Sequence, residues 1–198
     1  MNIVFDLGGV VVTWEPEQII AKRYTDPAMR ATVRDQIMAH ADWLELDRGT
    51  LPQKKAISRA AQRTKLSEAE VEQFLRHVAA ELVPVPQTVD LLYRLKAKGH
   101  SLSCLSNMHI SFIEHLEQTY RFSEVFSGAV ISCRLNLCKP EPAIYEYLLN
   151  TYGLDRQNTV FIDDIEANVI AAAKLGIQTI RFESAAQCER ELTRIGCL

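Results

Sequence analysis

The sequence predicts an α/β fold: a doubly wound, Rossmann-like parallel sheet that carries a small inserted α-helical cap. Two observations lead to this prediction. Short apolar runs, typical of buried parallel strands, alternate with amphipathic segments that are typical of helices. The alternation is interrupted once, between about residues 15 and 84, where the pattern is helical throughout. Strand–helix alternation with short connections indicates a parallel sheet with helices on both faces.

The elements of the core follow from the periods of the apolar residues. We expect strands at about 2–6, 101–106, 128–132, 159–163 and 177–182, and helices between them at about 86–98, 109–120, 140–152 and 165–175. Gly99, Gly153 and Gly176 each follow a helical segment and precede a strand, as a helix-terminating glycine does. Pro140 is expected to open its helix, where the missing N–H of proline is harmless.

The helical interruption predicts three or four helices. Ser67 and Glu70 have the spacing of a capping box that begins one of them. Pro84 and Pro86 mark the return to the core. The predicted division is therefore a core of residues 1–14 and 85–198 and a cap of residues 15–84. Ligands of open α/β sheets bind at the carboxyl ends of the strands, so a cap that leaves after the first strand would cover that site.

Composition narrows the class of protein. The 198 residues carry a net charge of −3, without the basic excess of a nucleic-acid binder. Asp6 interrupts the first apolar stretch, and the sequence lacks the run of about 18 apolar residues that a membrane span needs. The five cysteines form no CxxC pair, which disfavours a disulfide scaffold or a zinc site. We therefore expect a cytoplasmic protein with no nucleic-acid or membrane partner.

Acidic residues end two of the predicted strands. Asp6 is followed by Gly8 and Gly9, which favours an exposed carboxylate on a tight loop, although an Asp in an ordinary turn gives the same pattern. Asp163 and Asp164 end the fourth strand side by side. Adjacent like charges are unfavourable unless a cation compensates them, and Mg²⁺ is a suitable cation. Capping of the next helix by Asp164 is the alternative interpretation.

Two further places carry polar groups at strand or helix ends. Ser106 and Asn107 end the second strand with a hydroxyl and an amide, which also form common turns and helix caps. Lys139 precedes a predicted helix, where a cation opposes the helix dipole. An anion bound between the lysine and the helix would resolve this conflict, and a solvated lysine is the alternative.

In order and spacing, the segments FDLGGVVV, LSN, CKP and FIDDIEANVIAAAKLG resemble the four motifs of the haloacid dehalogenase superfamily. The resemblance covers almost the whole chain and includes a helical cap after the first motif. The fourth segment is most similar to the branch that contains small sugar phosphatases and the phosphatase domain of soluble epoxide hydrolases.

The resemblance implies a Mg²⁺-dependent hydrolase of small phosphorylated metabolites, in which Asp6 forms an aspartyl-phosphate that water then hydrolyses. It also implies that Mg²⁺ is held by Asp6, the Gly8 carbonyl and Asp164. Asp163 would be a further ligand or would act through water. The expected partner is a small phosphomonoester such as a sugar phosphate, and the oligomeric state is left open.

The same resemblance assigns roles to the remaining motif residues. Ser106 and Asn107 would donate hydrogen bonds to the phosphoryl oxygens, and Lys139 would neutralise charge on the nucleophile and the phosphate. Asn168 would support the carboxylates from one turn into the helix of the fourth motif, at about 165–175. Such a site works mainly by positioning and electrostatic stabilisation.

The sequence departs from the family pattern at Gly8. Phosphatases of this superfamily usually carry a second Asp here as general acid and base, which is worth roughly 10²–10⁴ in rate. Either the substrate has a leaving group that needs little protonation, as in a sugar-1-phosphate, or another residue replaces the acid. Glu15 and His109 are the candidates for that replacement.

Three other functions remain as alternatives. A haloacid dehalogenase also uses the first Asp, but it needs no metal, and the pair Asp163 and Asp164 disfavours it. A non-catalytic, regulatory phosphate-binding protein would explain Gly8 alone. A phosphotransferase would need the missing Asp to activate its acceptor.

Residues of the predicted cap offer weaker indications. Asp47, Arg48 and Gly49 resemble the glycine-containing substrate loop of such caps, although a polar turn between helices has the same composition. Trp14 and Trp43 would line the pocket between cap and core or serve only in packing.

Overall fold

The computed structural model describes residues 1–121 and 124–198, and its centre is a sheet of five parallel strands. The strands are β1 (Asn2–Phe5), β2 (Ser101–Ser106), β3 (Gly128–Ile131), β4 (Thr159–Asp163) and β5 (Gln178–Arg181). Their order is β3-β2-β1-β4-β5, so β1 lies at the centre and the chain winds outward on both sides. The observed strands lie within about two residues of the predicted ones, which confirms the α/β fold class.

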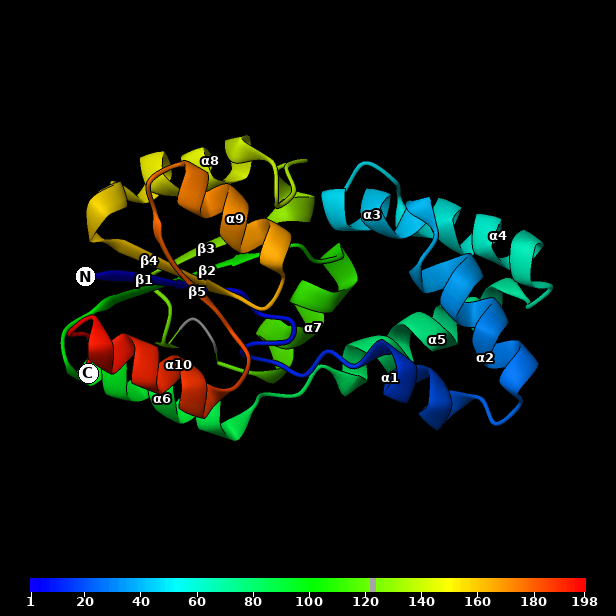
Figure 1. Cartoon of the computed structure of the whole chain (residues 1–198). Coiled ribbons are helices and arrows are strands. Elements are labelled where there is room, and N and C mark those ends of the chain that lie inside the picture. Colours follow the sequence, from blue (N-terminus) through cyan, green and yellow to red (C-terminus); the bar gives the residue numbers. More distant parts are fainter. Residues whose placement is uncertain (122–123) are drawn as a thin grey trace.

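Helices cover both faces of the sheet (Figure 1). One face packs on α6 (Pro86–Ala97), α7 (Ile110–Thr119) and α10 (Ala185–Arg194), and the other on α8 (Pro142–Tyr152) and α9 (Glu166–Lys174). Successive residues of β1 alternate between these two layers. Ile3 and Phe5 join the first apolar cluster and Val4 joins the second, and all three are fully buried. This alternation follows from the two-residue period of a strand.

The loop before α8 differs from the expectation. The helix begins at Pro142 instead of Pro140, and the peptide bond between Lys139 and Pro140 is cis. Proline does stand at the first helical position, as the pattern requires, but it is the second of the two prolines. Lys139 is consequently three residues away from the helix and does not face its first turn. The short 3₁₀ turn η3 (Ser132–Arg134) follows β3, and the short 3₁₀ turn η4 (Arg156–Asn158) precedes β4.

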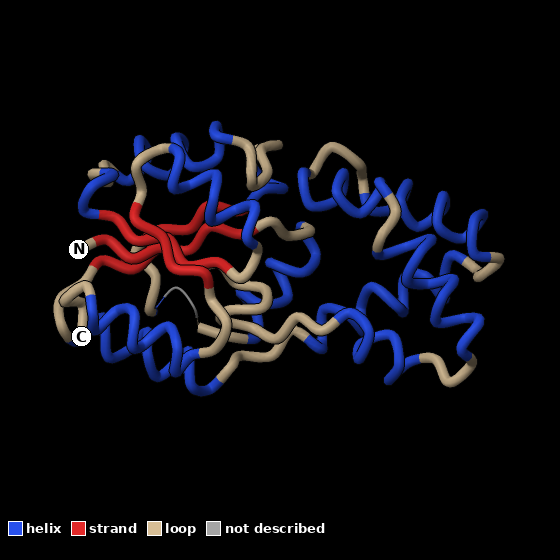
Figure 2. Tube along the Cα trace, in the orientation of Figure 1, coloured by secondary structure: helices blue, strands red, loops and turns tan. Residues whose placement is uncertain are grey.

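Residues 16–81 are helical and lie beyond the carboxyl ends of the strands (Figures 1 and 2). They form α1 (Pro16–Arg23), α2 (Pro27–Val33), the π-helical turn η1 (Arg34–Met38), α3 (Ala41–Arg48), α4 (Gln53–Thr64) and α5 (Glu68–Glu81). This is more than the three or four helices expected, because Asp26 and His40 each cap a new helix within the continuous helical pattern. The capping box of Ser67 and Glu70 is confirmed at the start of α5.

The two segments that connect the helical cap to the sheet run side by side. Val12 and Pro84 form an isolated antiparallel bridge. The Thr13 N–H donates to the Val83 carbonyl, and the Val85 N–H donates to the Val11 carbonyl, both at 2.9 Å. This pairing fixes where the cap leaves the core. Within residues 1–121 and 124–198, we find no helix that is both long and apolar enough to cross a membrane.

Candidate active site

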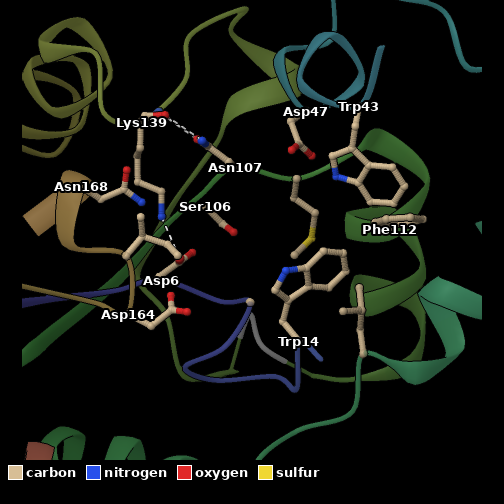
Figure 3. A pocket seen from close by; sticks show the side chains of 14 residues that line it. Asp6, Trp14, Trp43, Asp47, Ser106, Asn107, Phe112, Lys139, Asp164 and Asn168 are labelled. Carbon is tan, nitrogen blue, oxygen red and sulfur yellow. Dashed lines mark hydrogen bonds and ion pairs between the residues drawn. The ribbon is translucent and has the colours of Figure 1, made fainter. Parts of the chain in front are cut away.

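The carboxyl ends of three strands meet at one cavity of about 230 Å³ between cap and core (Figure 3). Asp6 follows β1, Ser106 ends β2, and Asp163 and Asp164 lie at the end of β4. Because β1 pairs with both β2 and β4, these residues are neighbours at the same edge of the sheet. Lys139 reaches the same place from the loop between η3 and α8. The structure therefore brings the four predicted segments together.

Lys139 lies between two of the carboxylates. Its ammonium nitrogen is 2.9 Å from Asp6 Oδ2 and 2.6 Å from Asp163 Oδ2, and its side chain is only 1% exposed. Burial alone would lower the pKa of Lys139, but the two carboxylates outweigh that effect and raise it, so the lysine is charged. Burial in turn raises the pKa of Asp6, and Lys139 opposes this shift. The expected conflict with a helix dipole does not arise, because α8 begins at Pro142, and the counter-charges of Lys139 are the protein's own carboxylates.

Asp163 is fully buried and accepts four hydrogen bonds. Besides Lys139, the Ile165 N–H donates to its Oδ1 at 2.8 Å, and the Asn168 amide donates to both oxygens at 3.1 Å. The support from Asn168 that the sequence indicated is present. These bonds hold Asp163 in one orientation and aim it at the lysine.

Asn107 holds the lysine loop from the other side. Its Nδ2 donates to the Lys139 carbonyl and its Oδ1 accepts from the Lys139 N–H, both at 2.9 Å (Figure 3). The amide was expected to face the phosphate, but in this structure both of its polar atoms contact the backbone of Lys139. Ser106 is buried and lines the cavity. Contacts of either residue with a phosphate stay predictions.

Three carboxylates offer a site for a cation. Oxygens of Asp6, Asp163 and Asp164 lie within 4.8 Å of one another. Burial and the neighbouring charge of Asp163 raise the pKa of Asp164, as expected where carboxylates outnumber the cations beside them. Lys139 forms ion pairs with two of these carboxylates, and the charge of Arg181 acts on Asp164, so three acidic groups face two cations. An oxygen-lined site with excess negative charge fits a hard divalent cation.

Gly9 allows the loop after β1 to approach Asp164. Its φ is +76°, and a Cβ at this position would lie 2.6 Å from Asp164 Oδ2. A residue with a side chain would therefore be strained and would also displace the carboxylate. The second glycine of the first motif is required by geometry.

Aromatic rings from the cap and from the core form the wall of the cavity that faces Asp6 and Asp164 (Figure 3). Trp14 and Trp43 have ring centroids 6.0 Å apart, and Trp43 lies 5.9 Å from Phe112. His109 stacks on Phe112 at 4.4 Å. The sequence indicated the two tryptophans, but it gave no sign of Phe112, which belongs to the regular apolar pattern of α7.

The sequence of the chain matches the model of one protein family. A family model described as haloacid dehalogenase-like hydrolase matches residues 1–176. The chain belongs to this family. The four segments around the cavity are thus the motifs of a haloacid dehalogenase-like hydrolase, on the fold that the sequence predicted.

Proteins with different activities are similar to this chain. The chain is 25% identical over 195 residues to the sesquiterpene phosphatase astK of Aspergillus oryzae. This match covers 98% of the present chain and 96% of astK. The chain is 36% identical over 126 residues to bifunctional epoxide hydrolase 2 of Mus musculus, a match to 62% of this chain and 23% of that longer enzyme.

Solved structures of the family share the fold. The enzyme bt-2542 of Bacteroides thetaiotaomicron, in a complex with magnesium and inorganic phosphate, superposes with a TM-score of 0.75 at 22% identity, over 92% of this chain and 93% of that one. An L-2-haloacid dehalogenase from Xanthobacter autotrophicus, with chloropropionic acid covalently bound, gives a TM-score of 0.69 at 16% identity, over 100% of this chain and 84% of that one.

The loop at Gly8 has space for a side chain. A Cβ added to Gly8 would lie 3.8 Å from Trp14, an ordinary contact distance. Of the two candidate replacements for the missing acid, Glu15 is exposed at the start of α1. His109 is 2% exposed, and burial lowers its pKa to about 3, so the ring is neutral and has no proton to give as an imidazolium.

Proposed function

We propose that this hydrolase is a Mg²⁺-dependent phosphatase that cleaves a small phosphomonoester through an aspartyl-phosphate on Asp6. The observation that carries the proposal is the placement of buried Lys139 between Asp6 and Asp163, beside a third carboxylate. A phosphoryl group attacked by Asp6 adds negative charge at this place, and fixed cations stabilise that charge. The phosphatase among the relatives supports the same reading.

Mg²⁺ would be held by the Asp6 carboxylate, the Gly8 carbonyl and Asp164, and when bound it would supply positive charge at the phosphoryl oxygens. Asp163 is already held by four hydrogen bonds, so we assign it the positioning of Lys139 and contact with the metal only through water. The magnesium and inorganic phosphate bound to bt-2542 support the use of Mg²⁺ with a phosphate at this fold.

The chain's own groups account for the attack on phosphorus. The Leu7 N–H donates to Asp6 Oδ1 at 2.6 Å and Lys139 lies 2.9 Å from Oδ2, so the nucleophile is held in one orientation. Asp6 would form a bond to phosphorus as the ester P–O bond breaks, and water would then cleave the aspartyl-phosphate. The Ser106 hydroxyl would donate to a phosphoryl oxygen.

The cavity favours a small substrate. Its volume is about 230 Å³, and Trp14, Trp43 and Phe112 form the wall that faces the carboxylates. Such rings pack equally well on the apolar face of a sugar and on a short isoprenoid chain. We propose a sugar phosphate such as a sugar-1-phosphate. A terpenoid phosphate is the second substrate to test, because one relative is a sesquiterpene phosphatase.

The test is hydrolysis of p-nitrophenyl phosphate with and without Mg²⁺, by the wild type, Asp6→Asn and Asp35→Asn. Asp35 is exposed on the cap and serves as the matched control. We expect Mg²⁺-dependent turnover that only Asp6→Asn abolishes, together with a higher Tm of the wild type in MgCl₂. Chloride release from 2-chloropropionate without metal would instead show a dehalogenase. A Tm raised by Mg²⁺ and phosphate without any turnover would show a binding protein.

A further inference from the structure

The proposed phosphatase needs a proton donor that Gly8 does not supply. Expulsion of an alkoxide from phosphorus is slow unless its oxygen is protonated as the bond breaks. A carboxyl group that faces the substrate from the side opposite the nucleophile would serve, because Asp6 attacks in line with the leaving oxygen. The neutral ring of His109 and the exposed side chain of Glu15 do not meet this requirement.

Asp47 does meet it. It lies in the last turn of α3 and lines the cavity on the side opposite Asp6 and Asp164 (Figure 3). Its side chain is 17% exposed, and its Oδ1 is 3.3 Å from His109 Nε2. No other carboxyl group of the cap borders the cavity within the described residues.

The surroundings of Asp47 favour the protonated acid. Burial and the negative charge of Asp6 raise the pKa of Asp47 to about 7, with Lys139 acting in the opposite direction. The neighbouring imidazole is neutral and provides no counter-charge. Asp42 on the same helix shows the contrast: burial would raise its pKa too, but hydrogen bonds from Arg63 and Arg59 outweigh burial and lower it.

The core holds this end of α3 in place. The Ser132 hydroxyl donates to the Asp47 carbonyl, and the Asn136 amide donates to the Arg48 carbonyl at 3.0 Å. Arg48 also forms a two-point ion pair with Glu141. These contacts position Asp47 on a rigid support, as a group that transfers protons requires.

Gly49 allows that close approach. It ends α3 with a φ of +79°, and a Cβ there would lie 2.1 Å from the Cys133 carbonyl oxygen. Any other residue would push the end of α3, and Asp47 with it, away from the core.

We propose that Asp47 is the general acid and base of the reaction, in place of the carboxyl group absent at Gly8. As Asp6 bonds to phosphorus and the ester bond breaks, the leaving oxygen takes the proton of Asp47 and departs as an alcohol. Water then enters the same position. Asp47 takes a proton from it as the hydroxyl bonds to phosphorus, the bond to Asp6 breaks, and phosphate is released with Asp47 again protonated.

The experiment compares leaving groups. Nitrophenolate departs without a proton and an alkoxide does not, so kcat/KM is measured for p-nitrophenyl phosphate and for an alkyl phosphate such as a sugar-6-phosphate. For Asp47→Asn we expect a fall of roughly 10²–10⁴ on the alkyl ester and a much smaller fall on the aryl ester. Glu15→Gln and the surface control Asp35→Asn should leave the ratio of the two substrates as in the wild type.

The outcomes separate this inference from the proposed function on which it rests. Failure of Asp6-dependent turnover of the aryl ester would refute the phosphatase itself. Turnover of the aryl ester with an equal loss on both esters in Asp47→Asn would refute only the role of Asp47, leaving it a structural residue. Gly49→Ala, which keeps the carboxyl group but displaces it, is the second variant. It should reproduce the selective loss on the alkyl ester, and an unchanged ratio would count against the proposal.

Discussion

Replacing Gly8 with Asp restores the carboxyl group that phosphatases of this superfamily usually carry. The structure allows the change: among the described residues the added Cβ would contact Trp14 alone, at 3.8 Å, and the φ of Gly8 lies outside the left-handed region. The new carboxyl group would border the same cavity as Asp47, from the core side. A general acid could then reach the leaving oxygen from either of two residues.

The size of the effect depends on whether the wild type already has an acid. A positioned acid is worth roughly 10²–10⁴ in rate, or about 3–5 kcal/mol. If Asp47 supplies the proton, Gly8→Asp adds a redundant donor and should change kcat/KM for alkyl phosphates by less than about tenfold, or 1.4 kcal/mol. In the Asp47→Asn background the same substitution should recover most of the lost rate. The two substitutions are therefore strongly non-additive.

The assay is a double-mutant cycle with an alkyl phosphate as substrate and Mg²⁺ at saturation. The four proteins are the wild type, Gly8→Asp, Asp47→Asn and the double variant, and their Tm values check that each is folded. We expect a coupling free energy of about 2–3 kcal/mol. A hundredfold gain from Gly8→Asp in the wild-type background, together with additive effects, would show that the natural enzyme lacks an acid and would refute the role of Asp47.

Three further changes have defined outcomes. Lys139→Met should reduce kcat by about 10³ and lower the Tm most in the absence of Mg²⁺, because Asp6 and Asp163 then lose the ammonium group that pairs with both of them. Gly9→Ala should raise the Mg²⁺ concentration needed for half-maximal activity, since its Cβ would meet Asp164, whereas Gly176→Ala, at a similar φ but in open space, should not. Asp42→Asn should lower stability at pH 7 by about 1–3 kcal/mol in urea unfolding. The folded-state pKa of Asp42 is lowered, so this difference should be fully present above the unfolded pKa of about 3.9. It should shrink as the pH falls below that value and vanish only below the lower folded-state pKa.

The sequence predicted the core well, because its signals are local. The apolar runs give the strands, and glycines such as Gly99 and Gly153 end the helices with positive φ. The cap was predicted less well. Its helical pattern is nearly continuous, and the breaks at Asp26 and His40 depend on side-chain capping, which the period of apolar residues does not reveal.

The sequence predicted which residues gather at the site, because the carboxyl ends of neighbouring parallel strands lie at the same edge of the sheet. Asp6, Ser106 and Asp163 had to meet once β1 was known to lie between β2 and β4. Which atoms they contact was not predictable, because that depends on side-chain orientation. The turning of Asn107 toward the backbone of Lys139 is an example, since its amide would suit a phosphate equally well.

Asp42 and Asp47 show why residue type alone does not assign a role. They are five residues apart on α3, which separates them by roughly 140° around the helix. One side faces α4, where Arg59 and Arg63 hold Asp42 as a carboxylate. The other side faces the core, where burial and a nearby negative charge favour a protonated Asp47. The docking of the cap on the core thus decides which Asp serves stability and which one serves as the acid.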